Sequence, residues 1–206
     1  MSEYQYNKVT PEMIEKFKEI APKRVLVGDE INEDFTHDEM AIYGKARPEV
    51  LVEATSTEEV AAVVKLCNEN KVPVTPSGAR TGLVGGAVSI GGGVMISLTK
   101  MNKILGYDKE NFVVKIQSGV LLNDLAQDAE KQGLLYPPDP GEKFATLGGN
   151  VSTNAGGMRA CKYGATRDYV RAMEVVLPTG EVTRFGSTVS KKSSGYSLLN
   201  LMIGSE

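Results

Sequence analysis

Glycine is the residue whose placement in this sequence most directly suggests chemistry. Of the 22 glycines, seven lie within residues 78–93 and six within residues 141–164. A glycine-rich segment exposes successive backbone N–H groups and lets a ligand approach the main chain closely, and such concave segments bind anions. Two of them in one chain predict two loops that face one ligand, and a pyrophosphate group is the natural candidate.

The first glycine-rich segment carries hydroxyl groups and a cation as well as its glycines. Residues 76–86 read PSGARTGLVGG, in which Ser77 and Thr81 could donate hydrogen bonds and Arg80 could add positive charge. The GxGxxG pattern of Rossmann folds and the GxxxxGKS/T pattern of P-loop NTPases are both absent. Because the segment follows a predicted strand, a wide turn between two strands remains an alternative to an anion site.

The second glycine-rich segment is dominated by small and hydroxylated side chains. Residues 146–164 read TLGGNVSTNAGGMRACKYG. Such a surface suits a flat aromatic ring and its phosphate tail lying against the main chain, whereas close packing of two subdomains is the alternative. The stiff sequence YPPDP at residues 136–140 lies between the two glycine-rich segments. Together these features favour a ligand site over two unrelated turns.

The overall composition argues against several other classes of function. The chain has 206 residues and a net charge of −3, so it has no basic surplus with which to neutralise nucleic-acid phosphates. No apolar run reaches the roughly 20 residues of a membrane span, and the N-terminus lacks a signal-peptide core. The two cysteines lie far apart and there is one histidine, which disfavours a disulfide scaffold and a metal site. We expect a soluble, cytoplasmic protein without a nucleic-acid partner.

The helices and strands expected around these loops form an α+β pattern. Apolar spacing and capping signals predict helices at 10–21, from Ser56 through Cys67, at 121–132 and at 197–203, and residues 146–158 could contain a short helix. Ser56 and Glu59 fit a capping box. Residues 28–49 read as irregular, and a subdomain boundary fits best near 100–110. Strands are expected at 50–54, 72–75, 94–98, 112–116, 170–177 and 181–185.

Several motifs occur in an order that is typical of one family. They are ARPE at 46–49, PSGARTGL at 76–83, YPPDP at 136–140, GGN at 148–150 running on to Gly157, KYG at 162–164 and GSE at 204–206. In this order the chain resembles the FAD-binding (PCMH-type) domain of the vanillyl-alcohol-oxidase-like flavoproteins. It is most similar to the branch of glycolate oxidase flavin subunits and D-lactate dehydrogenases. The resemblance covers residues 42–206.

The resemblance implies a fold and a set of cofactor contacts. The fold would be α+β, with FAD between two subdomains at about 42–105 and 106–206, after a helical or irregular lead-in at 1–41. In the family, the chain continues beyond the point that matches Glu206 into a substrate-binding domain. The residues implied to bind FAD are Pro76, Ser77, Gly78, Ala79, Arg80, Thr81, Gly82, Asp139, Thr146, Gly149, Ser152, Thr153, Gly156, Gly157, Tyr163 and Gly164.

The resemblance also implies a reaction and its partners. A D-2-hydroxy acid such as D-lactate, or glycolate, would pass hydride from its α-carbon to flavin N5. Electrons would leave to a protein acceptor, either an electron-transfer flavoprotein or an iron–sulfur subunit. The family's catalytic base and any metal ligands lie downstream of this chain, so no catalytic residue is named. Three alternatives remain open: another oxidase or synthase on the same flavin domain, a non-catalytic FAD or nucleotide-binding module, and a phosphosugar binder without flavin.

Three further residues, two cysteines and the histidine, have side chains that could take part in chemistry. Neither glycine-rich segment contains a histidine, so we expect non-covalent FAD, although Cys161 lies toward the end of the second segment. For Cys161 a packed thiol is favoured over a reactive one, and Cys67 is expected in the core. His37 could act as a base or a metal ligand beside Asp38, but a single histidine in a polar loop is more often simply solvated.

Overall fold

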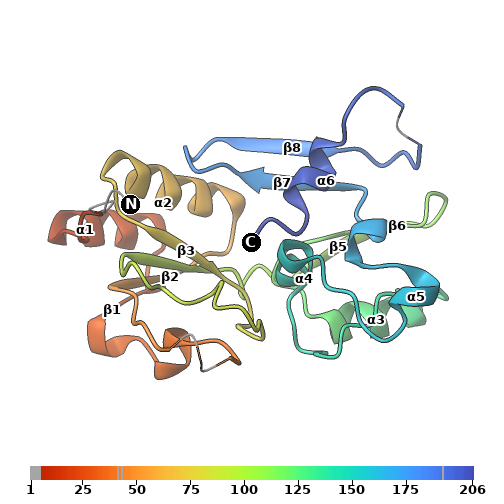
Figure 1. Ribbon diagram of the computed structural model, residues 1–206. Coiled ribbons are helices and arrows are strands. Elements are labelled where there is room, and N and C mark those ends of the chain that lie inside the picture. Colours follow the sequence, from red (N-terminus) through yellow and green to blue (C-terminus); the bar gives the residue numbers. More distant parts are fainter. Residues whose placement is uncertain (1–5, 41, 43, 192) are drawn as a thin grey trace. The chain divides into compact units, whose positions relative to one another are not determined.

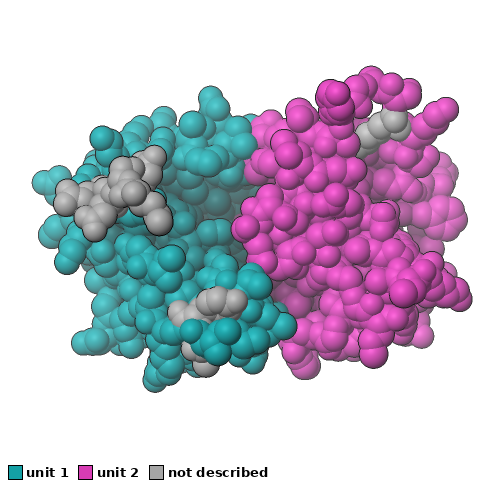
Figure 2. All heavy atoms as spheres, viewed as in Figure 1, with its two compact units in different colours: residues 1–100, 176–182 teal, residues 101–175, 183–206 magenta. Residues whose placement is uncertain are grey.

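The computed structural model describes residues 6–40, 42, 44–191 and 193–206. The chain forms two compact units (Figures 1 and 2). Unit 1 comprises residues 1–100 and 176–182, and unit 2 comprises residues 101–175 and 183–206. The chain therefore leaves unit 1 after Lys100 and contributes to it once more through a short later segment. The domain boundaries implied by the resemblance stay a prediction.

Unit 1 is built on a four-stranded sheet in the order β1-β2-β4-β3. The strands are β1 (Val25–Val27), β2 (Val50–Glu53), β3 (Val74–Ser77) and β4 (Val94–Ser97). β4 is parallel to both β2 and β3, and β1 is antiparallel to β2. All four residues of the central strand β4 are buried, as expected for a parallel strand that is covered on both faces.

The two faces of this sheet are covered by different parts of the chain (Figure 1). Helices α1 (Pro11–Ile20) and α2 (Thr57–Glu69) pack Phe17, Val63 and other apolar side chains against one face. Residues 28–36, which include the 3₁₀ turns η1 (Gly28–Glu30) and η2 (Glu33–Thr36), cover the other. The segment expected to be irregular therefore has a definite role, because its Ile31 and Phe35 complete the core.

The expected capping box at the start of α2 is only half formed. The hydroxyl of Ser56 accepts a hydrogen bond from Glu59 N at 3.3 Å, as predicted. The Glu59 carboxylate instead accepts hydrogen bonds from the backbone N–H of Thr55 at 2.8 Å and from the Arg24 guanidinium at 2.7 Å. Arg24 immediately precedes β1 and lies far from Glu59 in sequence, so no local pattern indicated this pair.

Unit 2 has an antiparallel strand pair, most of a second pair that ends in the returning segment 176–182, and several helices. The pairs are β5 (Ile104–Asp108) with β6 (Val113–Ile116), and β7 (Ala172–Val176) with β8 (Val182–Gly186). Val120, Leu122, Leu125 and Leu147 form its main core. The other elements are α3 (Leu122–Lys131), α4 (Leu147–Thr153), α5 (Ala160–Tyr163), the 3₁₀ turn η4 (Thr166–Tyr169) and α6 (Leu198–Met202).

The observed elements confirm the predicted helices, although α5 and the 3₁₀ turns were not predicted. Most predicted strands are also confirmed, with three differences. The sequence analysis missed β1, which has three residues, and β5, which contains Gly106. β3 lies two residues later than the predicted strand at 72–75, and it runs through Pro76. It is an edge strand, where sheets tolerate a proline. Among the described residues, no helix combines the length and apolar character that crossing a membrane requires.

Candidate functional site

The first glycine-rich segment leaves strand β3 and presents a run of backbone donors in unit 1. Pro76 and Ser77 still belong to the strand, and the chain loops from Gly78 onward. Within the part of the chain that the structure describes, the N–H groups of residues 78–84 have no hydrogen-bond acceptor. Seven successive amides without an internal partner form a donor set that fits phosphate oxygens.

The hydroxyl groups of this segment differ in their availability. Ser77 is 2% exposed, and its hydroxyl donates to Gly78 O at 3.4 Å. Thr81 is partly exposed, and its hydroxyl makes no hydrogen bond to another described residue. Ala79 and Gly82 are also partly exposed, and nothing lies within 4 Å of the position that a Cβ at Gly82 would take. Thr81 is therefore the better hydroxyl donor for a ligand.

Arg80 is the one cation of this segment, and its surroundings are unusual. Its backbone φ is +61°, and its guanidinium carbon lies 4.0 Å from the centroid of the Phe35 ring. Burial lowers the pKa of the guanidinium, and the negative charge of Asp34 acts in the opposite direction. This partly buried cation has no ion-pair partner among the described residues.

The second glycine-rich segment folds around the short helix α4 in unit 2. Thr146 caps this helix by accepting a hydrogen bond from Gly149 N at 3.3 Å. The exposed hydroxyls of Ser152 and Thr153 donate to the carbonyls one turn earlier, at 3.0 and 3.2 Å. These oxygens keep free lone pairs, so the two hydroxyls can still accept a hydrogen bond from a ligand.

Two further observations in unit 2 indicate hydrogen-bond donors that no group of the described chain uses. The side-chain nitrogen of Asn150 is buried and has no acceptor among the described residues. Such an orphaned donor is rare in folded proteins, where buried polar atoms almost always find a partner. The amides of residues 156–159, which follow α4, likewise lack an acceptor within the described ranges. Asn150 belongs to a quoted motif, but the sequence analysis did not select it as a cofactor contact.

Asp139 and Gly157, two predicted cofactor residues, lie in contact with each other. The contact is one of backbone packing within the protein. A Cβ at Gly157, whose φ is +118°, would lie 1.9 Å from the Asp139 carbonyl oxygen. The Asp139 carboxylate pairs with Lys143 and with the Arg159 guanidinium, the latter at 3.1 Å. The close approach explains the glycine at 157, and the two ion pairs explain the carboxylate at 139. Contact of either residue with FAD stays a prediction. At the neighbouring Gly156, an added Cβ would have Ala160 Cβ as its neighbour, at 3.7 Å.

The segment around Tyr163 is held by the turn that follows it. The Tyr169 hydroxyl donates to the Tyr163 carbonyl at 2.7 Å, and the Tyr169 ring meets Tyr136 edge-on at 6.0 Å. Burial raises the pKa of Tyr136 to about 12. Gly164 approaches Asp168 closely, and Asp168 accepts a hydrogen bond from Ala165 N at 2.8 Å. The motif residues Tyr163 and Gly164 thus sit in a well-defined turn.

The cysteines and the histidine behave differently from one another. Cys67 is fully buried in the core as expected, and burial raises the pKa of its thiol to about 12. The expectation of a packed thiol at Cys161 is wrong, because this residue lies exposed on α5. His37 Nδ1 lies 3.1 Å from the Asp38 carbonyl. The described residues contain no cluster of three or more groups suited to a metal ion.

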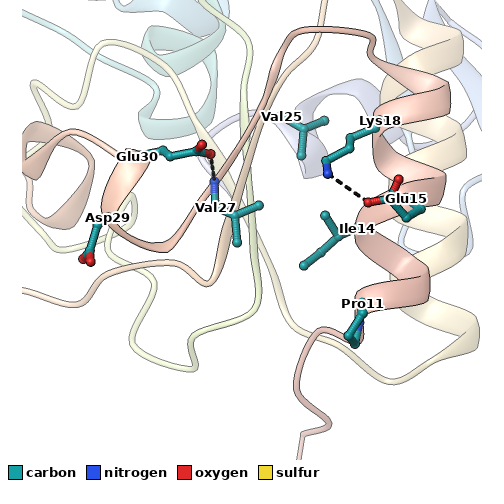
Figure 3. Close-up of a pocket in the computed structure, with 8 residues that line it drawn as sticks. All are labelled: Pro11, Ile14, Glu15, Lys18, Val25, Val27, Asp29 and Glu30. Atoms are coloured by element: carbon teal, nitrogen blue, oxygen red, sulfur yellow. Dashed lines mark hydrogen bonds and ion pairs between the residues drawn. The ribbon is translucent and has the colours of Figure 1, made fainter.

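Two pockets can be compared with these predicted residues. A pocket of about 540 Å³ in unit 1 lies between α1 and β1 (Figure 3). Its Lys18 is paired with Glu15 at 2.8 Å, and Asp29 and Glu30 add negative charge, so it is ill-suited to phosphate. A pocket of about 590 Å³ in unit 2 lies beside α3 and includes Asp139. Asp139 is the only predicted cofactor residue in either lining.

The donor sets described above fit the cofactor that the sequence predicted. Unit 1 supplies a run of free amides with an uncompensated cation, as a diphosphate requires. Unit 2 supplies free amides, hydroxyls and the buried Asn150 donor, which fit a polar ribityl chain and ring. The sequence analysis missed Phe35, whose ring contacts Arg80, and Asp38, whose Oδ2 accepts a hydrogen bond from Gly85 N at 2.7 Å. It also missed Asn150. Phe35 and Asp38 had no local signal, whereas the position of Asn150 inside a quoted motif could have identified it.

Comparison with known proteins supports this interpretation. The sequence model of a family described as "FAD binding domain" matches residues 48–186. A D-lactate dehydrogenase of Anaerostipes hadrus is 94% identical over 206 residues, covering 100% of this chain and 43% of that protein. The glycolate oxidase subunit GlcD of Bacillus subtilis is 40% identical over 163 residues, covering 79% of this chain and 35% of that protein.

Solved structures give the same result for the fold. An alkyldihydroxyacetonephosphate synthase superposes with a TM-score of 0.85 at 25% identity, covering 98% of this chain and 38% of that one. p-Cresol methylhydroxylase with substrate bound gives a TM-score of 0.80 at 26% identity, covering 93% and 40%. The predicted α+β fold of the PCMH-type flavoproteins is confirmed.

This chain belongs to the FAD binding domain family, and the prediction of FAD as its cofactor is confirmed. It spans less than half the length of the relatives named above.

Proposed function

We propose that this chain is the FAD-binding part of a flavin-dependent D-2-hydroxy-acid dehydrogenase that acts on D-lactate or glycolate. The observation that carries the proposal is the 94% identity to a D-lactate dehydrogenase over the whole chain. The glycolate oxidase subunit supports the same substrate class, since both names refer to small 2-hydroxy acids. Bound FAD would supply the acceptor for the hydride that the substrate loses.

The residues of this chain bind and orient the cofactor in this proposal. The free amides of residues 78–84, together with Arg80 and Thr81, hold the diphosphate. The second segment, with Asp139, would line the flavin and its ribityl chain, and the amides of residues 156–159 and the Asn150 side chain would be its hydrogen-bond donors. FAD is held without a covalent bond. Although Cys161 is exposed, nothing else in its surroundings supports a thioether.

The partners and location complete the proposal. The relatives are more than twice as long as this chain, so we place substrate binding and the catalytic base in regions that this chain does not span. Electrons pass to a protein acceptor, either an electron-transfer flavoprotein or an iron–sulfur subunit. The whole enzyme acts in the cytoplasm.

The cofactor part of the proposal is tested by visible absorption of the purified chain. The chain is incubated with FAD, desalted and then precipitated with acid. We expect a flavin spectrum that survives desalting, with all colour released into the acid supernatant. Colour that stays with the precipitate would contradict non-covalent binding, and Cys161→Ser would then test the thioether. A chain extended to the length of its relatives that retained no FAD would overturn the proposal.

The substrate part needs that extended chain. With D-lactate or glycolate under anaerobic conditions, we expect the flavin absorption near 450 nm to bleach, whereas L-lactate serves as the stereochemical control. Bleaching only by a phenol, or by no member of a 2-hydroxy-acid panel, would contradict the assignment. It would favour instead another enzyme built on the same flavin domain.

A further inference from the structure

We propose that residues 32–40 act as a clamp for the first glycine-rich segment, fixing it through Phe35 at Arg80 and through Asp38 at Gly85. The clamp preorganises the free amides of residues 78–84 and the Arg80 guanidinium for the two phosphates of FAD. The inference rests on the proposed function and assigns positioning roles to two residues outside every motif. Both contacts lie within unit 1.

The Asp38 contact defines the C-terminal end of the free amide run. Asp38 is 4% exposed, and its Oδ2 accepts a hydrogen bond from Gly85 N at 2.7 Å. Its Oδ1 accepts from Met40 N at 3.0 Å. No basic group of the described chain pairs with this carboxylate. A buried carboxylate without a counter-ion is costly, and here two amide donors satisfy it.

The Phe35 contact fixes the cation near the start of the same run. Phe35 packs against Ile31, Leu51 and Met95 on the face of the sheet opposite α1 and α2. Its ring is therefore held by the core, and the Arg80 guanidinium carbon lies 4.0 Å from its centroid. The guanidinium makes only one hydrogen bond within the described chain, to Gly78 O at 3.4 Å. Stacking on the ring leaves most of its donors free for a ligand.

The clamp itself is anchored to the rest of unit 1. The hydroxyl of Thr36 donates to Glu33 O at 2.7 Å, and the carbonyl of Thr36 accepts from Ala46 N at 2.8 Å. The segment between Phe35 and Asp38 is thus fixed at its centre. Both ends of the run from Arg80 to Gly85 are consequently held by residues 32–40. This reduces the conformational entropy that the run loses when a ligand binds.

The test uses two variants with matched controls. Phe35→Leu removes the aromatic face but keeps an apolar side chain, and Phe35→Tyr keeps the face. Asp38→Asn places an NH₂ group where two amide donors converge, so one of them loses its acceptor. Asp29→Asn makes the same chemical change at an exposed aspartate of the same region. Circular dichroism and thermal unfolding check that each variant folds.

The first readout is the affinity for FAD compared with riboflavin, which lacks phosphates. We expect Phe35→Leu to weaken FAD binding by about 3- to 30-fold and to change riboflavin binding by less than about twofold. Phe35→Tyr should restore most of the FAD affinity. Asp38→Asn should weaken FAD binding by at least ~10-fold. Equal losses for both ligands, or an unchanged FAD affinity, would overturn the clamp.

The second readout is hydrogen exchange of the Gly85 amide in the protein without FAD. Asp38→Asn should accelerate this exchange by at least about tenfold, whereas Asp29→Asn should leave it unchanged. This arm does not depend on cofactor binding. A wild-type chain that bound neither FAD nor riboflavin would count against the proposed function. The exchange rate of the Gly85 amide would still test the clamp. Unaltered exchange in Asp38→Asn would overturn it.

Discussion

At the scale of single residues, Glu59 shows how one carboxylate joins several segments of unit 1. It accepts hydrogen bonds from Arg24 and from Thr55 N, and Arg24 also donates to Glu53 O at 2.8 Å. The hydrogen bond from Arg24 is the main reason that the pKa of Glu59 is lowered to about 2, against a usual 4.5. Because the folded-state pKa is depressed, the stabilisation is complete above pH 4.5 and is lost as the pH falls toward 2.

This pKa shift predicts a pH-dependent cost for Glu59→Gln. The free energy of unfolding of the wild type should exceed that of the variant by up to about 3 kcal/mol at pH 7. Between pH 6 and pH 3.5 the difference should shrink by roughly 1.4 kcal/mol, because the unfolded state begins to bind a proton there. Urea unfolding at several pH values measures both quantities.

Glu15→Gln is the matched control for this prediction. Glu15 also forms an ion pair, with Lys18, but both side chains are at least half exposed. Solvent screens such pairs, so we expect little effect of Glu15→Gln at any pH. A difference for Glu59→Gln that did not change with pH would refute the role assigned to its ionisation.

At the scale of elements, the second glycine-rich segment depends on a close approach of two backbones. Gly157 has a φ of +118° and faces the Asp139 carbonyl, so no side chain fits there. We expect Gly157→Ala to lower the free energy of unfolding by at least about 2 kcal/mol. Gly156→Ala should change it by less than half of that, because its new methyl group would meet Ala160 at an ordinary 3.7 Å.

Chemical unfolding of both alanine variants, measured without FAD, decides this prediction. A large cost for Gly157→Ala in the absence of cofactor would mean that the glycine serves the turn itself. Equal stability of the two variants would contradict the packing described here. In that case the motif glycine would have to be explained by the ligand alone.

At the scale of the whole molecule, the chain returns to unit 1 for a single turn. Residues Val176–Val182 join unit 1, and a Cβ at Gly180 would lie 2.6 Å from Lys65 Cβ and 2.9 Å from Ala61 O on α2. Gly180→Ala should therefore be more destabilising than Gly133→Ala. Gly133 has a similar positive φ, but nothing lies within 4 Å of its Cβ position.

Thermal unfolding of these two variants measures how much the returning turn contributes to unit 1. Both alanines incur the backbone strain of about 1–3 kcal/mol that a positive φ imposes on non-glycine residues. Only Gly180→Ala adds a clash with α2, so the difference between the variants reports the packing of the turn. Equal melting temperatures would mean that the turn does not support α2.

Features of the site that were predicted differ from those that were missed in how far apart in sequence the interacting residues lie. The glycine-rich segments were recognisable because their motifs are contiguous in sequence. Phe35 and Asp38 were not, because each contacts a residue about 45 positions away. The ion pair of Asp139 with Arg159 was also missed, as was the exposure of Cys161. Such contacts depend on which loops the fold brings together.

The sequence by itself determined the capped helices, the buried strand β4, the two glycine-rich segments and the family with its FAD cofactor. These follow from local patterns, such as Ser56 as the cap of α2 and apolar spacing along α3. Only the tertiary structure decided the short strands β1 and β5, which exist because β2 and β6 pair with them. It also decided that residues 32–40 support the glycine loop, since that support consists of contacts between distant parts of the chain.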